Sequence, residues 1–503
     1  MRLPRRVPAV PVPAVPALLC VLVGVLLAGF LAADPLSPDP RPARPPGGGT
    51  VDVWLTTTSG PGGRDVVKGL ERQRPLRFTG RAAGRGAITV DASRTYQEFA
   101  GGGASFTDTA AWLLNSSGAL SDRKREEVMR RLFSPDDGIG LSFLRNPMGA
   151  SDLARFGYTY DDLPAGRTDP GLSRFSIKHD LADVLPLTRR ARELNPALTV
   201  MASPWTAPAW MKDNKRLDQG HLAARYYGTY ARYFVKYLQA YRAHGVPVGY
   251  VSAQNEPTCC RGYPSMRWSG SGLHYFTKRE LLPRLRAAGL PTKVLALDWN
   301  WDRYESHGAP VVADPAVRAH PNFGGIAWHG YSGDARTQSA VHDAHPGVDA
   351  FDTELSGGDW TADQHRSDMR GLIDATRNWG RSWVKWSLAV DQDGGPHHGG
   401  CGSCTGLVTV HNGDRRHGEA DFTVEYYTMG HLTKFVRPGA SRIASTADSA
   451  VPNVAWRNPD GSRALIAYND TGRARTIEVG ADGRSFRYEL PAGASATFTW
   501  RGD

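Results

Sequence analysis

Two glutamates, Glu256 and Glu354, each follow a short apolar run in widely separated parts of the chain. Pro257 comes directly after Glu256; its ring cannot donate to a strand ladder and keeps the preceding residue out of the helical region, so the strand predicted at 248–253 should end there. Glu354 follows the run 348–351. One strand-end glutamate could equally be a solvated loop residue. Two in matching settings indicate paired acid–base chemistry at the C-terminal ends of barrel strands.

Polar and aromatic side chains also follow the other predicted strands. They are Arg145, Asp152, Trp205, Asn255, Asp298, Trp299, Asn300, His329, Tyr331 and Trp386. Flat rings cover the apolar faces of a sugar, while carboxylates and amides bind its hydroxyl groups. We therefore expect a carbohydrate substrate whose glycosidic bond lies between the two glutamates. A carboxyl separation of about 5 Å predicts retention of configuration, and one of about 6.5–9.5 Å predicts inversion.

Other reaction classes have weaker support. The sequence has no G-x-S-x-G motif, which disfavours a serine hydrolase. It has no HExxH motif, and His329 stands alone at its strand end, so we expect neither a metal nor a cofactor at the site. Gly101-Gly102-Gly103 lacks the rest of a dinucleotide fingerprint and is predicted to form a tight turn. A non-catalytic carbohydrate-binding barrel is the alternative of another class, and the presence of both glutamates argues against it.

Eight short apolar runs alternate with longer amphipathic segments from about residue 94 onward. The predicted strands are 97–101, 141–145, 198–203, 248–253, 293–298, 325–329, 350–353 and 383–390. Between them, the segment 121–133 has Ser121 as its predicted N-cap. Tyrosines recur at helical spacing in 221–242, where they are expected to pack in the core. Eightfold alternation of strand and helix predicts an α/β fold, a (β/α)8 TIM barrel.

A second, smaller domain is predicted after residue 436, where the pattern of the sequence changes. Short alternating runs are separated there by turn signals such as Asn458-Pro459-Asp460-Gly461, which is typical of an antiparallel β-sandwich. A strand-like segment at 51–58 precedes the barrel and is expected to join this sandwich. The predicted domains are a signal peptide (1–33), a Pro/Gly-rich linker (34–50), N-terminal sandwich strands (51–93), the catalytic barrel (94–436) and the C-terminal sandwich (437–503).

The overall charge and the N-terminal segment bear on partners and localisation. The chain of 503 residues has a formal net charge of +10, but no basic block is interleaved with aromatic residues, so no nucleic-acid partner is expected. Arg2, Arg5 and Arg6 precede the apolar run 17–33, which predicts an export signal and a secreted protein. An uncleaved anchor is the alternative; no membrane span is expected in the mature chain. The oligomeric state is not indicated.

Cysteine usage agrees with export. Cys20 lies in the leader, which leaves the candidates Cys259, Cys260, Cys401 and Cys404. An even number in an exported protein favours disulfides, in one of three connectivities. Zinc bound by Cys401 and Cys404 with the neighbouring histidines at 397–398 is the alternative, and it has less support.

Ordered motifs spread over residues 97–396 carry a resemblance to a known family. They are FAGGGASFTD at 99–108, RNPMGASD at 145–152, ASPWTAP at 202–208, QNEP at 254–257, Thr353-Glu354 and GGP at 394–396. By these motifs the chain resembles glycoside hydrolase family 30, the glucosylceramidase-like retaining hydrolases. The resemblance implies a barrel joined to a β-sandwich that is built from both chain ends.

The resemblance also implies roles for individual residues. Glu256 would be the acid/base, Glu354 the nucleophile, and Asn255 would hold the 2-hydroxyl of the sugar. Asp152, Trp205 and Trp386 would line the glycone subsite, and His329 and Tyr331 would lie near the nucleophile. Arg145, from the strand-end set, completes the predicted substrate-binding residues.

Some residues depart from the glucosylceramidase pattern. These departures do not affect the two catalytic glutamates, but they leave open which aglycone the enzyme accepts. Ser387 stands where that pattern has Asn, the segment 354–358 differs, and the loop 391–418 is long. We expect a secreted retaining hydrolase of β-glucosidic bonds, glucosylceramidase-like. The alternative is an endo-β-1,6-glucanase or another β-glycanase of the family, such as one that cuts xylan-type chains.

Overall fold

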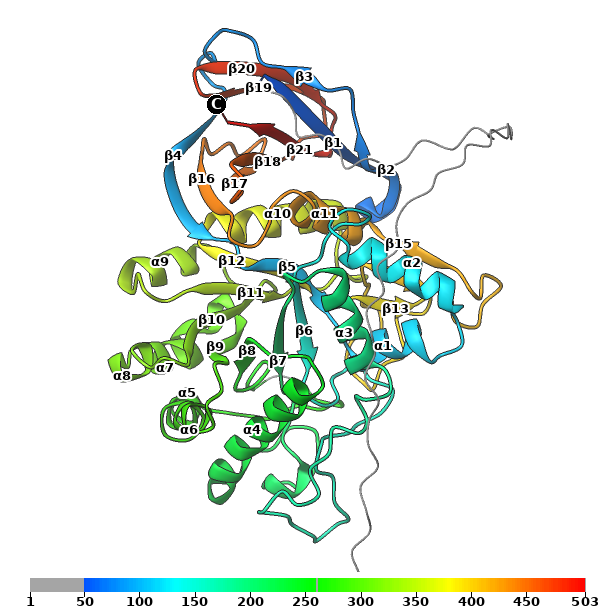
Figure 1. The fold of residues 1–503 in the computed structure, drawn as a ribbon, viewed down its shortest axis with the longest axis vertical. Coiled ribbons are helices and arrows are strands. Elements are labelled where there is room, and N and C mark those ends of the chain that lie inside the picture. Colours follow the sequence, from blue (N-terminus) through cyan, green and yellow to red (C-terminus); the bar gives the residue numbers. More distant parts are fainter. Residues whose placement is uncertain (1–48, 259–260, 503) are drawn as a thin grey trace, which may run out of the picture. The chain divides into compact units, whose positions relative to one another are not determined.

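The computed structural model describes residues 49–258 and 261–502. The predicted signal peptide, nearly all of the predicted linker, and Cys259 and Cys260 lie outside the described residues. Within the described part, eight parallel strands form a closed barrel, and a separate 10-stranded sheet forms the sandwich (Figure 1). This confirms the predicted fold class.

The barrel strands follow one another around the sheet in chain order. They are β5 (Gly101–Ser105), β6 (Phe143–Pro147), β7 (Thr199–Ser203), β8 (Tyr250–Ser252), β9 (Lys293–Asn300), β10 (Phe323–His329), β11 (Ala350–Glu354) and β12 (Gly380–Lys385), which pairs with β5. Apolar side chains from six of the eight strands fill the centre of the barrel. They are Phe143, Met201, Leu295, Ala327, Phe351 and Val384.

The first barrel strand differs from its prediction. It spans residues 101–105, whereas 97–98 end β4 (Ile88–Glu98), which belongs to the sandwich sheet. The predicted tight turn at Gly101-Gly102-Gly103 is therefore wrong, because these glycines lie within β5. Their small size is needed for close approach of the backbones: a Cβ added to Gly103 would lie 1.9 Å from the carbonyl oxygen of Phe143 on β6. Glycine here signals packing rather than a turn.

The eighth predicted strand, 383–390, is divided in two. Residues up to 385 belong to β12, and 389–391 form β13 (Ala389–Asp391). β13 pairs with β14 (Val408–Val410), which pairs with β15 (Ala420–Phe422) in a small sheet beside the barrel mouth. The long loop predicted after this strand is therefore anchored at both ends by hydrogen-bonded strands.

Helices follow most of the barrel strands. The α-helices are α1 (Asp108–Asn115), α2 (Asp122–Phe133), α3 (Val184–Leu194), α4 (Tyr227–Ala243), α5 (Gly270–Tyr275), α6 (Leu282–Ala287), α7 (Ala309–Val312), α8 (Pro315–Arg318), α9 (Arg336–Ala344), α10 (Gln364–Arg377) and α11 (Val424–Thr433). Short 3-10 segments lie at 61–63, 209–211, 224–226 and 301–303, and π-helical segments lie at 276–281 and 304–308.

Two local predictions about the helices are confirmed. Ser121 caps α2, because its hydroxyl accepts a hydrogen bond from the backbone N–H of Lys124. Tyr230, Tyr233 and Tyr237 on α4 are completely buried in the core. Within the described ranges, we find no helix that combines the length and the hydropathy needed to cross a membrane.

The sandwich is built from both ends of the described chain. Its strands are β1 (Thr50–Ser59), β2 (Asp65–Arg72), β3 (Leu76–Arg77), β4, β16 (Ser441–Ser445), β17 (Asn453–Arg457), β18 (Ser462–Tyr468), β19 (Arg475–Ala481), β20 (Arg484–Leu490) and β21 (Ser495–Arg501). β1 pairs antiparallel with β21, and β4 lies between β16 and β19. The segment 51–58 therefore finds the partner that its sequence predicts.

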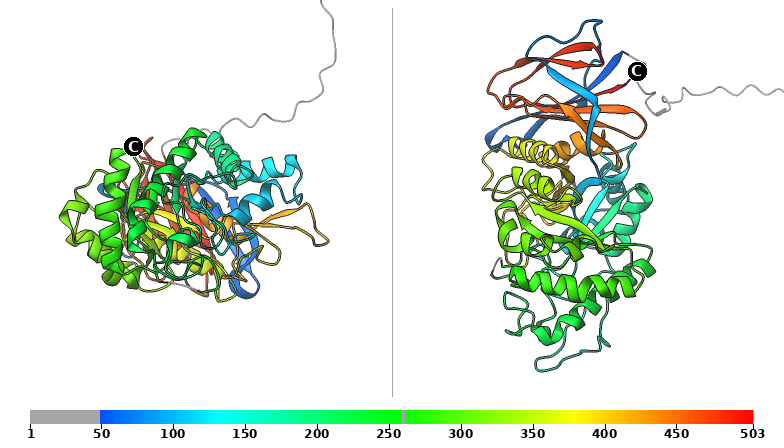
Figure 2. Two further views of the ribbon diagram at one scale, coloured as in Figure 1. Left: turned by 90° about the horizontal axis from the view of Figure 1, so that it is seen from below. Right: turned by 90° about the vertical axis from the view of Figure 1, so that its left-hand side faces the viewer.

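Helices α10 and α11 lie between the sandwich and the barrel (Figures 1 and 2). Each carries one buried histidine that bonds to sandwich hydroxyls. His365 Nε2 lies 2.8 Å from Ser495 Oγ. His431 Nδ1 and Nε2 each lie 2.8 Å from a threonine hydroxyl, those of Thr497 and Thr56. Burial lowers the pKa of His365 to about 4 and that of His431 to about 3, so both rings are neutral in the folded protein near pH 7.

These two histidines should make the fold sensitive to acid. In the unfolded chain each ring has a pKa near 6.5, so the unfolded state takes up protons below that pH while the folded state does not. Their contribution to stability is complete above about pH 6.5 and falls toward pH 4, by roughly 1.4 kcal/mol per histidine per pH unit at most. His365→Gln with His431→Gln should flatten the pH dependence of the free energy of unfolding between pH 6.5 and 4.5, measured by urea titration. Replacement of the exposed His417 by Gln is the control; an unchanged slope in the double variant would contradict the assignment.

Candidate active site

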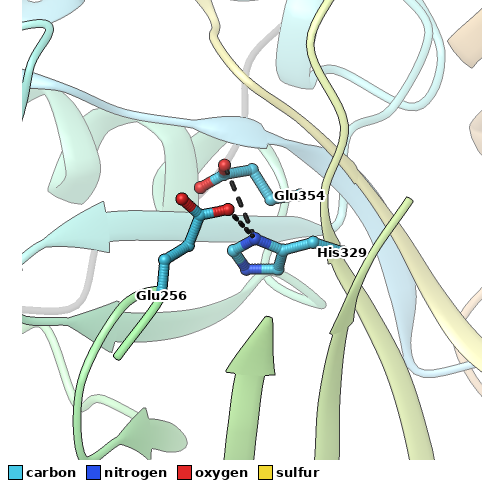
Figure 3. A group of neighbouring side chains, drawn as sticks. All are labelled: Glu256, His329 and Glu354. Carbon is cyan, nitrogen blue, oxygen red and sulfur yellow. Dashed lines mark hydrogen bonds and ion pairs between the residues drawn. The ribbon is translucent and has the colours of Figure 1, made fainter. Parts of the chain in front are cut away.

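Glu256 and Glu354 face each other at the mouth of the barrel. Glu354 is the last residue of β11, and Glu256 lies in the loop after β8. One oxygen of each carboxyl group and one ring nitrogen of His329 all lie within 4.8 Å of one another (Figure 3). The backbone fixes this loop: the N–H of Glu256 donates to the carbonyl of Asp298, and that of Asn255 to the carbonyl of Pro204. Two strand ends thus present an opposed pair of carboxyl groups.

The two carboxyl groups sit in different surroundings. Glu354 has 7% of its side chain exposed, and both its oxygens accept hydrogen bonds: Oε2 from Arg145 Nη1 at 2.5 Å and Oε1 from the Tyr331 hydroxyl at 3.0 Å. Burial raises the pKa of Glu354, and His329 and Arg145 oppose that rise. The side chain of Glu256 is 14% exposed, and its Oε1 lies 3.0 Å from His329 Nδ1. Glu354 is therefore the more buried of the two side chains, and hydrogen bonds fix both of its oxygens.

His329 lies beneath both glutamates. Its Nδ1 contacts Glu256, and its Nε2 lies 3.1 Å from Asp298 Oδ1. Burial alone would lower the pKa of His329, but Glu354, Asp298 and Glu256 together raise it to about 9. The ring is then an imidazolium at neutral pH and donates from both nitrogens.

The spacing of Glu256, His329 and Glu354 would also suit a metal ion. A metal ligand, however, must offer an unprotonated nitrogen. Since the raised pKa of His329 favours its protonated form, a metal ion would have to displace a proton to bind there.

Asp298 on β9 accepts hydrogen bonds from several other residues of this site. In the sequence it is only one of several polar strand-end residues. Its carboxylate is completely buried and bonds to Arg145 Nη2 at 2.9 Å, to His329, and to the hydroxyl of Thr353 at 3.0 Å. Hydroxyls of Ser203 and Ser252 also donate to it. Despite burial, Arg145 and His329 hold the pKa of Asp298 far below its usual range. The signal in the sequence is one acidic residue directly after the apolar run VLAL at 294–297.

A pocket of about 430 Å³ opens above the two glutamates. The predicted residues that line it are Asp152, Trp205, Asn255, Tyr331 and Trp386. The rings of Trp205 and Trp386 stack with their centroids 4.9 Å apart and form an aromatic wall. The structure therefore brings most of the predicted substrate-binding set to one cavity.

Asp152 is a buried carboxyl in this wall. The backbone N–H groups of Leu153 and Cys401 donate to it. Burial and the nearby charge of Glu354 raise the pKa of Asp152 to about 7. A group with that pKa can exist in both protonation states near neutral pH, so it can either donate to or accept from a sugar hydroxyl.

Arg145 and His329 occupy a different position from the rest of the predicted set. Both side chains are completely buried, and neither is among the described residues that line the pocket. Arg145 Nη2 donates to Asn255 Oδ1 at 2.6 Å, and thus orients a residue that does line it. Their position beneath the pocket suits them to hold other side chains in place.

Several lining residues were not predicted as site residues: Tyr263, Trp299, Asn300, Ser356 and Trp360. Trp299 and Asn300 belong to the polar and aromatic strand-end residues that the sequence analysis identifies. Tyr263 and Trp360 come from loops, where no periodic pattern indicates which side chain turns toward the pocket.

Cys401 and Cys404 form a disulfide, and both residues line the pocket. The two sulfur atoms are bonded to each other, an arrangement that favours the disulfide over the zinc alternative for this pair. The loop that carries the disulfide meets the loop around residue 262: a Cβ added to Gly399 would lie 2.1 Å from the carbonyl oxygen of Gly262.

Comparison with known proteins agrees with this geometry. Residues 99–436 match the family model described as the glycosyl hydrolase family 30 TIM-barrel domain, and residues 439–498 match that of the family's beta sandwich domain. An endo-1,6-beta-D-glucanase of Trichoderma harzianum is 32% identical over 439 residues, 81% of this chain and 85% of the relative. The lysosomal acid glucosylceramidase of Mus musculus is 28% identical over 443 residues, 82% of this chain and 83% of the relative. A solved structure of an endo-beta1,6-glucanase superposes with a TM-score of 0.80 at 29% identity, covering 90% of this chain and 100% of that one. The chain belongs to glycosyl hydrolase family 30.

Proposed function

We propose that this protein is a secreted, retaining β-glycosidase that cleaves β-1,6-linked glucan. The observation that carries the chemistry is the opposed pair Glu256 and Glu354, whose oxygens lie within 4.8 Å at the barrel mouth. That separation suits double displacement, since an inverting pair needs room for a water molecule at about 6.5–9.5 Å. Export is inferred from the basic and apolar N-terminal segment.

The substrate is proposed from the relatives. The relatives that cover most of this chain at 32% identity are endo-1,6-beta-D-glucanases. They support the β-1,6-glucanase alternative better than the glucosylceramidase-like interpretation that the motifs first favoured. Cleavage of glucosylceramide remains the second candidate, because the mouse lysosomal acid glucosylceramidase is 28% identical over a similar length.

In the proposed mechanism Glu354 attacks the anomeric carbon. Hydrogen bonds from Arg145 and Tyr331 fix both of its oxygens and stabilise the carboxylate form. Glu256 is the more exposed of the pair and protonates the departing glycosidic oxygen. After the glycosyl–enzyme forms on Glu354, Glu256 takes a proton from water, which releases the sugar with its configuration retained.

Asp298 acts in this mechanism as a positioning residue. It contacts neither the pocket nor a reacting atom, but its carboxylate bonds to both cations that hold the glutamates, Arg145 and His329. Its negative charge helps to keep His329 protonated. Arg145 and His329 are likewise proposed to orient Glu354, Asn255 and Glu256 rather than to touch the sugar.

A substrate panel tests the proposed activity. Incubation with a linear β-1,6-glucan, with glucosylceramide and with an aryl β-glucoside should give short oligosaccharides from the glucan, detected by chromatography. Rapid release of ceramide with no product from the glucan would reverse the order of the two candidates. An absence of product from all three substrates would contradict the proposed function.

Azide rescue tests the role of each glutamate. Glu354→Gly should lower kcat on an activated aryl β-glucoside at least about a thousandfold, and azide should restore turnover by forming the α-glycosyl azide, because azide enters where the nucleophile is missing. Glu256→Ala should keep the first step on this substrate, and azide should then give the β-glycosyl azide. NMR of the product distinguishes the two anomers, and an exchange of the anomers between the variants would exchange the assigned roles.

The titration of His329 tests the positioning role of Asp298. Asp298→Asn removes the charge that helps to raise the pKa of His329, so that pKa, followed by NMR of the imidazole ring, should fall by about one to three units. A purely structural role would lower activity without this fall in the pKa of His329. Asp183→Asn is the control: Asp183 is also buried, but its carboxylate accepts hydrogen bonds from Asn115 and Ser116, which do not line the catalytic pocket as described.

A further inference from the structure

Two further cavities adjoin the catalytic pocket. The second cavity, of about 510 Å³, shares Tyr331, Ser356 and Trp360 with the first. The third, of about 520 Å³, shares Ser367 and Arg370 with the second. Together they form a series that runs from Glu354 past the loop at 355–363 to the face of α10 that carries Ser367 and Arg370. We call the second and third cavities the α10 groove.

Trp360 stands at the junction between the catalytic pocket and the α10 groove. It is 56% exposed, which is unusual for so large an apolar side chain, and it lines both cavities. Tyr331 lies at the same junction and is 39% exposed, with its hydroxyl on Glu354. An exposed flat ring next to hydrogen-bonding groups is the surface on which a sugar ring stacks.

The rest of the α10 groove has a mixed lining, in which Trp301, Leu355 and Trp383 are the large apolar side chains. Ser367 and Thr361 offer hydroxyls, and Arg370 and Asp374 offer charged groups. Arg370 is held in place, because Nη1 lies 2.9 Å from Asp470 of the sandwich. A guanidinium that is already oriented loses little side-chain freedom when it donates to a ligand.

A lining of charged groups beside apolar rings favours one class of occupant. Alkyl chains of a lipid would have to desolvate the charged groups of Arg370 and Asp374 without replacing their hydrogen bonds, which is costly. Sugar units carry hydroxyls for these groups and an apolar face for Trp360. Because the groove and the catalytic pocket share Tyr331, Ser356 and Trp360 as lining residues, parts of one chain can reach both sites.

We propose that the α10 groove binds the glucosyl units of a glucan chain that lie outside the catalytic pocket, with Trp360 as the stacking platform at its entrance. This inference rests on the proposed function and specifies its substrate as a chain of several units. The groove makes longer chains better substrates than an aryl glucoside, which fills the catalytic pocket alone.

Two variants test the groove. Trp360→Ala removes the platform, and Ser367→Trp fills the groove with a bulky side chain; each should lower kcat/KM for β-1,6-linked glucohexaose about tenfold more than for an aryl β-glucoside. Tyr275→Ala and Ser271→Trp are the matched controls, because they alter exposed positions of α5, which lines none of the three cavities as described. Equal losses on both substrates, or wild-type rates that do not depend on chain length, would overturn the proposal.

Binding without turnover separates this inference from the proposed activity. In the Glu354→Gln background, calorimetry should show that glucohexaose binds about tenfold more tightly than the β-1,6-linked disaccharide, and Trp360→Ala or Ser367→Trp should abolish that gain. Equal affinity for the two sugars overturns the groove even if the wild-type enzyme is active. If glucohexaose binds more tightly than the disaccharide and both variants remove this difference, the groove is supported. This holds even if the enzyme hydrolyses a bond other than the one proposed.

Discussion

Five ionisable side chains meet at the barrel mouth almost without contact with water, and this constraint governs the rest of the structure. Arg145 comes from β6, Asp298 from β9, His329 from β10 and Glu354 from β11, and Glu256 follows β8. Burial of any one of these charges alone would be strongly unfavourable. In the folded protein two cations neutralise the three carboxyl groups. Arg145 pairs with Asp298 and Glu354, and His329 pairs with Asp298 and Glu256. The site is stable only when the closed barrel brings all these strand ends together, so catalysis and the fold depend on the same contacts.

Helix α10 shows how the surrounding elements serve that site. It begins shortly after Glu354, and it carries His365 toward the sandwich and Ser367 toward the groove. Arg366 and Arg370 both pair with Asp470 of the sandwich. The sandwich therefore fixes the position of α10, which forms one wall of the α10 groove. In this way the sandwich contributes to the proposed substrate binding, although it supplies no residue to the catalytic pocket as described.

The sequence predicts those features that have a local cause. Strand breaks by proline and glycine mark Glu256 and Glu354, and alternation of apolar and amphipathic segments predicts the barrel. The position of β5 escapes prediction because its glycines are required by the neighbouring strand, which is distant in sequence. Asp298 escapes for a similar reason: its importance lies in partners on five other strands. Trp360 comes from a loop, where the direction of a side chain depends on tertiary contacts alone.

A second buried charge cluster explains how specificity can change while the catalytic pair stays fixed. Lys385, at the end of β12, contacts Asp368 of α10 at 2.6 Å and Glu425 of α11 at 2.8 Å. Thr405, next to the disulfide, donates its hydroxyl to Glu425, and its N–H donates to the carbonyl of Gly357. The loop that carries the disulfide is thus anchored to Lys385 and not to Arg145 or His329. Since the two clusters share no residue, substitutions in this loop can reshape the pocket wall around Asp152 without displacing the charges that orient Glu256 and Glu354.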